Sequence, residues 1–158
     1  MYIKLCLIVA ACMGTASHVA LASEAAPPLG DVENAISDLG RPDSFEEACR
    51  RVQNAPNWQT PGAIVFLKEW VGEHPEHAEE CFGLITNNLT TRNLIDRNEY
   101  DLPMAICAIG TIGLVGQSDD LAARCKQFLT AFGVTIASSC ILAARKADLL
   151  QLISECCK

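Results

Sequence analysis

The sequence has few positive charges and few aromatic residues. Its 158 residues include 12 Lys and Arg against 19 Asp and Glu, so the formal net charge at pH 7 is −7. Because a nucleic-acid-binding surface needs clustered positive charge, this balance argues against nucleic acid as a partner. Half of the residues are hydrophobic and only 20% are charged, which excludes intrinsic disorder for most of the chain.

Signatures of the common enzyme classes are also missing. The chain contains no G-x-S-x-G, no glycine-rich phosphate loop and no H-E-x-x-H, so the corresponding hydrolase, nucleotide-binding and metalloprotease sites are not predicted. It also lacks C-x-x-C, which argues against a zinc ribbon or a thioredoxin-type redox site. Enzymatic activity is therefore uncertain, its absence is favoured, and no cofactor is expected.

The start of the chain has the pattern of a secretory signal peptide. Lys4 lies in a short basic segment, residues 5–13 are apolar, and Ala20-Leu-Ala22 is a small-x-small cleavage pattern. Cleavage after Ala22 removes residues 1–22 and leaves seven of the nine cysteines. We therefore expect a secreted, extracellular protein.

No later segment is long enough to span a bilayer. The apolar stretches 104–116 and 134–144 are shorter than the roughly 20 residues that a transmembrane helix needs. We expect no stable membrane span and interpret both stretches as buried helices.

Helix start signals recur from about residue 43 onward. Ser44-Phe-Glu-Glu47 has the pattern of a capping box, and Ser118 is a candidate N-cap. Prolines suited to the first turn of a helix occur at positions 61, 75 and 103. For helix ends, Thr90-Thr91 indicates a break and restart, and Gly133 fits a C-terminal cap. Strand alternation is absent, so the pattern predicts helices alone.

We therefore predict an all-α fold, a compact bundle or short stack of six to seven helices with disulfide cross-links. The predicted organisation is a signal peptide at 1–22, a flexible leader at 23–42 with at most a two-turn helix, and a helical domain at 43–158. The predicted core consists of apolar and aromatic residues at helical spacing: Phe66, Leu67, Trp70, Phe82, Ile85, Ile106, Ile109, Phe128, Leu129 and Ile141. Gly110, Gly113 and Gly116 share one helix face and predict close helix packing.

Cysteines are the most informative residue type in this sequence. The seven that follow the signal peptide fall about one to each predicted helix: Cys49, Cys81, Cys107, Cys125, Cys140, Cys156 and Cys157. In a small secreted domain such cysteines predict at least two disulfides, whose connectivity the sequence does not give. The alternative is that several are simply small buried hydrophobic residues. Because adjacent cysteines make a strained bridge, we expect Cys156 and Cys157 to have different partners, or one of them to form an intermolecular disulfide.

One segment is dense in metal-ligating residue types. His77 and Cys81 are four apart on one helix, and His74 precedes them in a run that also holds several glutamates. A divalent transition metal uses such groups. Acidic residues at a helix start are also explained by the helix dipole alone. We favour that simpler interpretation and treat His74, His77 and Cys81 as weak metal candidates.

The chain contains a single N-glycosylation sequon. Asn88-Leu-Thr90 matches the acceptor pattern, and it lies at a predicted helix end where a glycan could be tolerated. Asn88 is therefore a glycosylation candidate.

These features together predict function mainly by exclusion. An acidic, cysteine-rich, secreted helical domain without a catalytic motif is expected to act by extracellular binding, as an effector-like or toxin-like interaction protein. The alternative is a carrier of a small apolar ligand held between helices. A metal-dependent enzyme at His74, His77 and Cys81 is the third alternative.

Overall fold

A computed structural model describes residues 40–54, 60–92, 94, 97 and 100–158. All of these residues belong to one structural unit, Glu33–Lys158. The predicted signal peptide and residues 23–39 of the predicted leader, with its short helix, lie outside the described residues. The structure therefore bears on the predicted helical domain only.

The described part of the chain is entirely helical. It forms six α-helices and one short 3-10 helix, and contains no strand. In chain order these are α3 (Phe45–Asn54), α4 (Thr60–Glu73), η1 (Pro75–His77), α5 (Ala78–Thr91), α6 (Asp101–Val115), α7 (Asp119–Ser138) and α8 (Ala143–Cys156). The prediction of an all-α fold is confirmed. Within the described ranges, no helix is long and apolar enough to cross a membrane.

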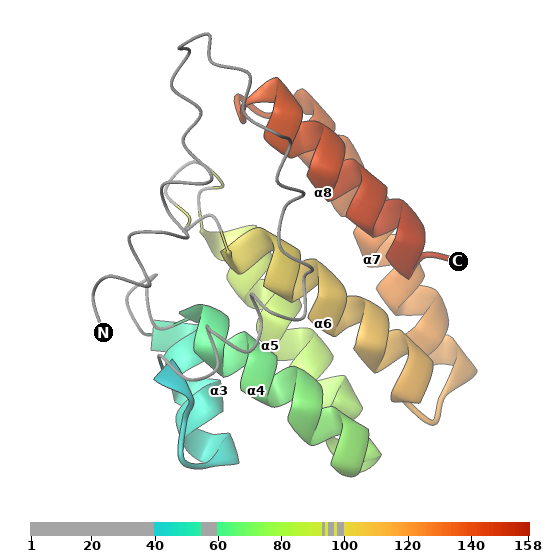
Figure 1. Ribbon diagram of the computed structural model, residues 1–158. Helices are drawn as coiled ribbons and strands as arrows, with labels where there is room; N and C mark the ends of the chain where they lie inside the picture. The colour runs from blue at the N-terminus through green and yellow to red at the C-terminus, as the bar shows by residue number, and fades with distance from the viewer. Residues whose placement is uncertain (1–39, 55–59, 93, 95–96, 98–99) are drawn as a thin grey trace, which may run out of the picture. The chain divides into compact units, whose positions relative to one another are not determined.

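Helix α6 lies at the centre of the fold. It packs against α4 and α5 on one side and against α7 and α8 on the other, and α3 packs on α4 and α5 at the outer edge (Figure 1). The reason is in its sequence, DLPMAICAIGTIGLV, which offers apolar residues all round the helix. A helix of this kind is stable only when neighbours cover it on several sides.

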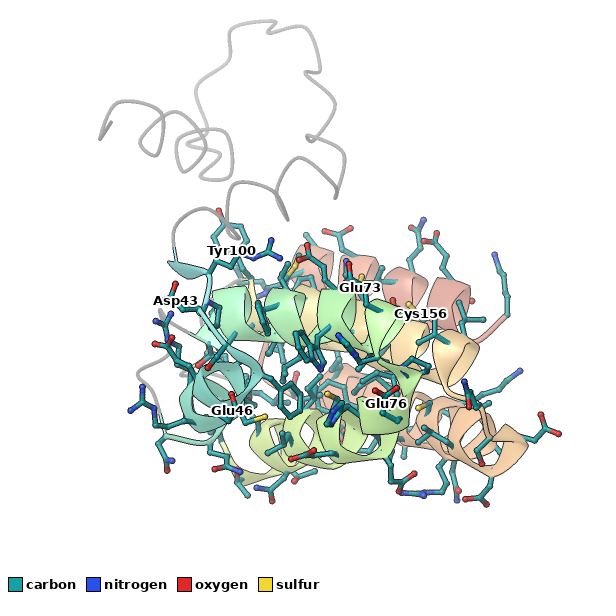
Figure 2. The ribbon with its side chains drawn as sticks, turned by 90° about the horizontal axis from the view of Figure 1, so that it is seen from below. Asp43, Glu46, Glu73, Glu76, Tyr100 and Cys156 are labelled. Carbon is teal, nitrogen blue, oxygen red and sulfur yellow. The ribbon has the colours of Figure 1, made fainter. Side chains whose placement is uncertain are left out.

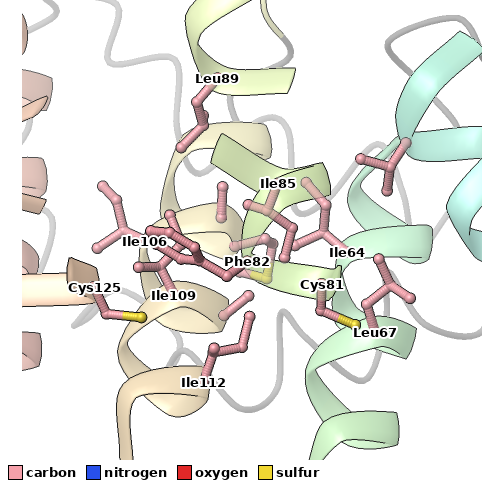
Figure 3. Close-up of a cluster of buried hydrophobic side chains, with 14 of the residues drawn as sticks. Ile64, Leu67, Cys81, Phe82, Ile85, Leu89, Ile106, Ile109, Ile112 and Cys125 are labelled. Carbon is pink, nitrogen blue, oxygen red and sulfur yellow. The ribbon is translucent and has the colours of Figure 1, made fainter. Parts of the chain in front are cut away.

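The core forms around the isoleucines of α6. Ile106, Ile109 and Ile112 are fully buried, and Figure 3 shows them among side chains of α4, α5 and α7. Seven of the ten predicted core residues are buried, and the other three, Trp70, Phe128 and Ile141, are partly buried against the core. The predicted core is therefore confirmed for these seven residues, and the other three lie at its edge.

Small residues on α6 allow this close packing, as the glycine spacing predicts. A Cβ on Gly113 would lie 3.1 Å from the Cβ of Cys125, on α7. A Cβ on Gly116 would lie 2.9 Å from a methyl group of Leu121. A larger side chain at either position would require its neighbours to move.

One predicted helix end is confirmed and another is wrong. Helix α5 ends at Thr91, where the sequence predicts a break, and the hydroxyls of Thr90 and Thr91 donate to the carbonyl oxygens four residues earlier, at 3.0 and 2.7 Å. Gly133, in contrast, does not end its helix. It is buried inside α7, with Leu150 and Ile153 of α8 packed over it, so this glycine serves a helix contact.

Only one of the two hydrogen bonds of the predicted capping box forms. The amide of Glu47 donates to the Ser44 hydroxyl at 3.2 Å. The Glu47 carboxylate, however, accepts from the amide of Asp43 at 3.0 Å. It also pairs with Arg51 one turn later, so the same carboxylate stabilises both the start and the body of α3.

Candidate functional site

A cluster of aromatic and histidine rings forms a half-buried surface where α3, α4 and η1 meet. Trp70 is at its centre and stacks on His74 with ring centroids 4.1 Å apart. Phe45 of α3 lies 5.6 Å from Trp70 and 4.6 Å from His77, and Phe66 lies one turn before Trp70 at 5.9 Å. We call these five residues the ring cluster. Each such pair adds about 0.5–1.5 kcal/mol beyond the area that it buries.

Carboxylates border the ring cluster. Glu76 lies 3.4 Å from Nδ1 of His74, and Glu80 lies 3.3 Å from Nδ1 of His77. Glu46 and Glu80 both act electrostatically on Cys49, which places them on the same side of the molecule. In Figure 2, Glu46 marks the α3 side of this surface and Glu76 the η1 side.

Glu76 favours its charged form. A hydrogen bond from its own backbone amide lowers the pKa of Glu76, and the hydrogen bond and charge of His74 lower it further. Glu76 and Glu80 are both more than half exposed. The surface therefore combines aromatic faces with carboxylates that are accessible to water and to other molecules.

The weak metal candidates lie near one another in sequence but are not arranged as a ligand set. The His74 and His77 rings are 6.4 Å apart, each with a glutamate beside it, whereas Cys81 is fully buried below them. No group of three or more His, Cys, Asp or Glu suited to a metal occurs among the described residues. The histidines contribute to the ring cluster, a role that the sequence analysis missed although the spacing of Phe66, Trp70 and His74 is that of one helix face.

Asn88, the glycosylation candidate, is only 4% exposed. Its amide nitrogen donates to the carbonyl oxygen of Val52 at 2.6 Å, and its amide oxygen accepts from Arg97 at 2.9 Å. Arg97 is also buried, and the nearby charge of Asp101 partly compensates the lowering of its pKa by burial. A glycan on Asn88 would have to disrupt this buried network, so glycosylation stays a prediction that the fold disfavours.

The structure does not support the predicted disulfide cross-links. All seven cysteines that it describes are free thiols, and no two are at bonding distance. Cys81 and Cys125 are buried in the core (Figure 3), as small hydrophobic residues often are. Cys140 is exposed, and the other four are half-buried.

The thiols differ in chemistry because their surroundings differ. Burial raises the pKa of Cys49 and of Cys125 to about 11 each, and that of Cys81 to about 12. A hydrogen bond from Cys107 has the opposite effect and lowers the pKa of Cys156 to about 7. Only the thiolate is strongly nucleophilic, so Cys156 is the most reactive of these four.

Comparison of this chain with protein-family models, with curated proteins and with solved structures finds no match.

Proposed function

We propose that this protein is secreted and acts by binding an extracellular protein, with the ring cluster as the contact surface for a basic segment of the partner. The observation that carries the proposal is the contact of Trp70 with His74 and His77. Glu76 and Glu80 lie beside these two histidines on the same accessible surface. Aromatic faces attract Lys and Arg side chains, and carboxylates nearby add to that attraction.

The chain already uses this combination twice for its own arginines, once at Phe66 of the ring cluster and once at Phe82 of α5. The guanidinium carbon of Arg41 lies 5.6 Å from the centroid of Phe66, and its Nη2 contacts Glu69 at 2.8 Å. Arg124 likewise lies 5.2 Å from the centroid of Phe82 and contacts Glu79 at 2.6 Å. Two guanidinium groups thus already lie between a ring and a carboxylate. The net charge of −7 adds long-range attraction for a basic partner.

A short synthetic peptide that alternates arginine and serine provides the probe. Its citrulline analogue keeps the shape of the side chains and removes their charge. Fluorescence anisotropy of the labelled peptides, measured over a range of salt concentrations, should show binding of the arginine peptide only. Binding should weaken with salt, because the contacts are exposed to solvent.

A pair of double variants separates this surface from the general negative charge. Glu76→Gln with Glu80→Gln should weaken binding by about three- to tenfold, since each exposed ion pair contributes about 0.2–1 kcal/mol. Asp148→Asn with Glu155→Gln removes the same charge from exposed positions on α8 and should leave affinity almost unchanged. Equal loss in both double variants, or equal binding of the citrulline peptide, would refute the proposed surface.

The two alternative functions stay predictions. A carrier would retain a stoichiometric apolar ligand, which native mass spectrometry of the purified protein detects. A metal-dependent enzyme at His74, His77 and Cys81 would retain a metal, which elemental analysis detects and which His77→Ala would remove.

A further inference from the structure

Cys107 and Cys156 lie together where the central helix α6 packs against the end of α8. A Cβ on Gly110 would lie 2.9 Å from the Cβ of Cys156 and 3.0 Å from its Sγ. Cys107 lies one turn before Gly110 on the same face of α6, and its thiol hydrogen-bonds to the sulfur of Cys156. The absence of a side chain at Gly110 therefore lets the two sulfurs meet.

This pair is accessible, unlike the thiols in the core. Cys107 and Cys156 are both half-buried, whereas Cys81 and Cys125 are buried. The hydrogen bond from Cys107 stabilises the thiolate of Cys156, against the opposing effects of burial and of Glu155, and holds its pKa near 7. Cys156 thus supplies a nucleophilic thiolate, and the thiol of Cys107 is already hydrogen-bonded to it.

We propose that Cys156 is a modification site for small disulfides such as oxidised glutathione, and that Cys107 is its resolving thiol. In the first step the thiolate of Cys156 attacks one sulfur of oxidised glutathione. A mixed disulfide forms and one glutathione thiolate leaves. In the second step Cys107 gives its proton to solvent and attacks the sulfur of Cys156. The second glutathione leaves as thiolate, and both glutathione thiolates take up protons.

The net result is a disulfide between Cys107 and Cys156 and two reduced glutathione molecules. Two protein thiols are oxidised and one glutathione disulfide is reduced, so electrons balance. The product joins α8 to the centre of the fold. It requires only a small approach of two sulfurs that are already in contact.

Peptide mapping of the purified protein tests the bond directly. Cleavage after Arg97, Arg124 and Lys146 places Cys107 alone in peptide 98–124, and Cys156 with Cys157 in peptide 147–158. After treatment with oxidised glutathione and blocking of free thiols, mass spectrometry should find these two peptides joined. The link should persist in Cys157→Ser and disappear in Cys156→Ser. Absence of the link from the treated, unsubstituted protein, or its loss in Cys157→Ser, would overturn the proposal.

Two variants of Cys107 separate its two roles. Cys107→Ser keeps a hydrogen-bond donor but cannot resolve, so Cys156 should react at nearly the original rate and accumulate bound glutathione. Cys107→Ala removes the donor as well. If the pKa of Cys156 then returns to about 9, the reaction at pH 7 should slow about sixfold, because a roughly 50-fold loss of thiolate is partly offset by greater intrinsic nucleophilicity. Identical rates in both variants would show that Cys107 does not activate Cys156.

Discussion

Two helix contacts in this molecule each bring a pair of cysteines together, and they have opposite effects on the sulfur atoms. At the contact of α3 with α5, Cys49 lies near enough to Cys81 to add to the rise in its pKa, which burial drives to about 12. At the contact of α6 with α8, the hydrogen bond from Cys107 lowers the pKa of Cys156 to about 7. In the first pair Cys81 is fully buried and burial is the largest effect on both thiols, whereas in the second pair both thiols are half-buried and one donates a hydrogen bond to the other. Thiol chemistry here depends on the helix contact and not on the presence of a neighbouring cysteine.

The largest expected effect is a difference in alkylation rate between the two contacts. At pH 7 and with the protein folded, iodoacetamide should modify Cys156 at least about a hundred times faster than Cys81. Their thiolate fractions differ by more than four orders of magnitude, and the greater intrinsic nucleophilicity of a thiol with a higher pKa offsets only part of this difference. Peptide-resolved mass spectrometry over time measures both rates. A similar rate at the two cysteines would show that the contacts do not differ in this way.

The second prediction disrupts the contact of α3 with α5. Asn88→Ala removes the hydrogen bond that joins α5 to the carbonyl oxygen of Val52 in α3. It also removes the side-chain amide oxygen that accepts from the buried guanidinium of Arg97. We expect a loss of about 2–4 kcal/mol in the free energy of unfolding, since an unsatisfied buried charge is costly. Urea denaturation followed by circular dichroism measures this loss, and alkylation of Cys81 should become faster. Thr86→Ala is the matched control and should change both quantities little, because Thr86 is only half-buried and its hydroxyl bonds to carbonyl oxygens of its own helix.

The residues at these contacts also show what the sequence could and could not predict. Helix α6 was predictable because its apolar residues occur all round the helix, which itself indicates a central position. Gly133 was misinterpreted because a glycine that ends a helix and a glycine that admits a neighbouring helix look the same in one sequence. The break at Thr90 and Thr91 was predictable because both have low helix propensity, and α5 ends at Thr91.

The candidate site was less predictable than the fold. Cys107 and Cys156 are far apart in the chain, and their proximity follows from the packing of α8 on α6, which no local pattern encodes. The ring cluster depends in the same way on Phe45 of α3 reaching Trp70 of α4. The sequence shows the residue type of His74 and His77, and for this reason it indicated metal chemistry. It does not show that their rings contact Trp70 and Phe45.

The third prediction separates the reactive pair by filling the space between the helices. Gly110→Ala places a methyl group 2.9 Å from the Cβ of Cys156, so α8 must shift. We expect a loss of about 1–3 kcal/mol in stability from this overpacking and slower alkylation of Cys156, because Cys107 no longer reaches it. Gly83→Ala is the control: nothing lies within 4 Å of a Cβ there, so it should stabilise its helix by about 0.5–1 kcal/mol. Unchanged stability in Gly110→Ala would mean that the helices do not approach as closely as described.

The smallest expected effect is a pH dependence of stability with opposite sign for the two contacts. The folded pKa of Cys156 is about 7 against a reference value of 9.0, so between these pH values the unfolded state binds more protons and stability should rise with pH. Because this thiol is half-exposed, we expect a rise of about 1 kcal/mol, well below the full value for two pKa units. Cys49 and Cys81 have raised pKa values, so the folded state binds more protons above pH 9 and stability should fall there. Urea denaturation midpoints should be measured from pH 6 to 10 for the original protein, Cys156→Ala and Cys49→Ala. The comparison shows which thiol causes the rise of stability between pH 7 and 9 and which causes the fall above pH 9. If Cys156→Ala retained the whole rise between pH 7 and 9, other groups would cause it and the contrast between the two contacts would not extend to stability.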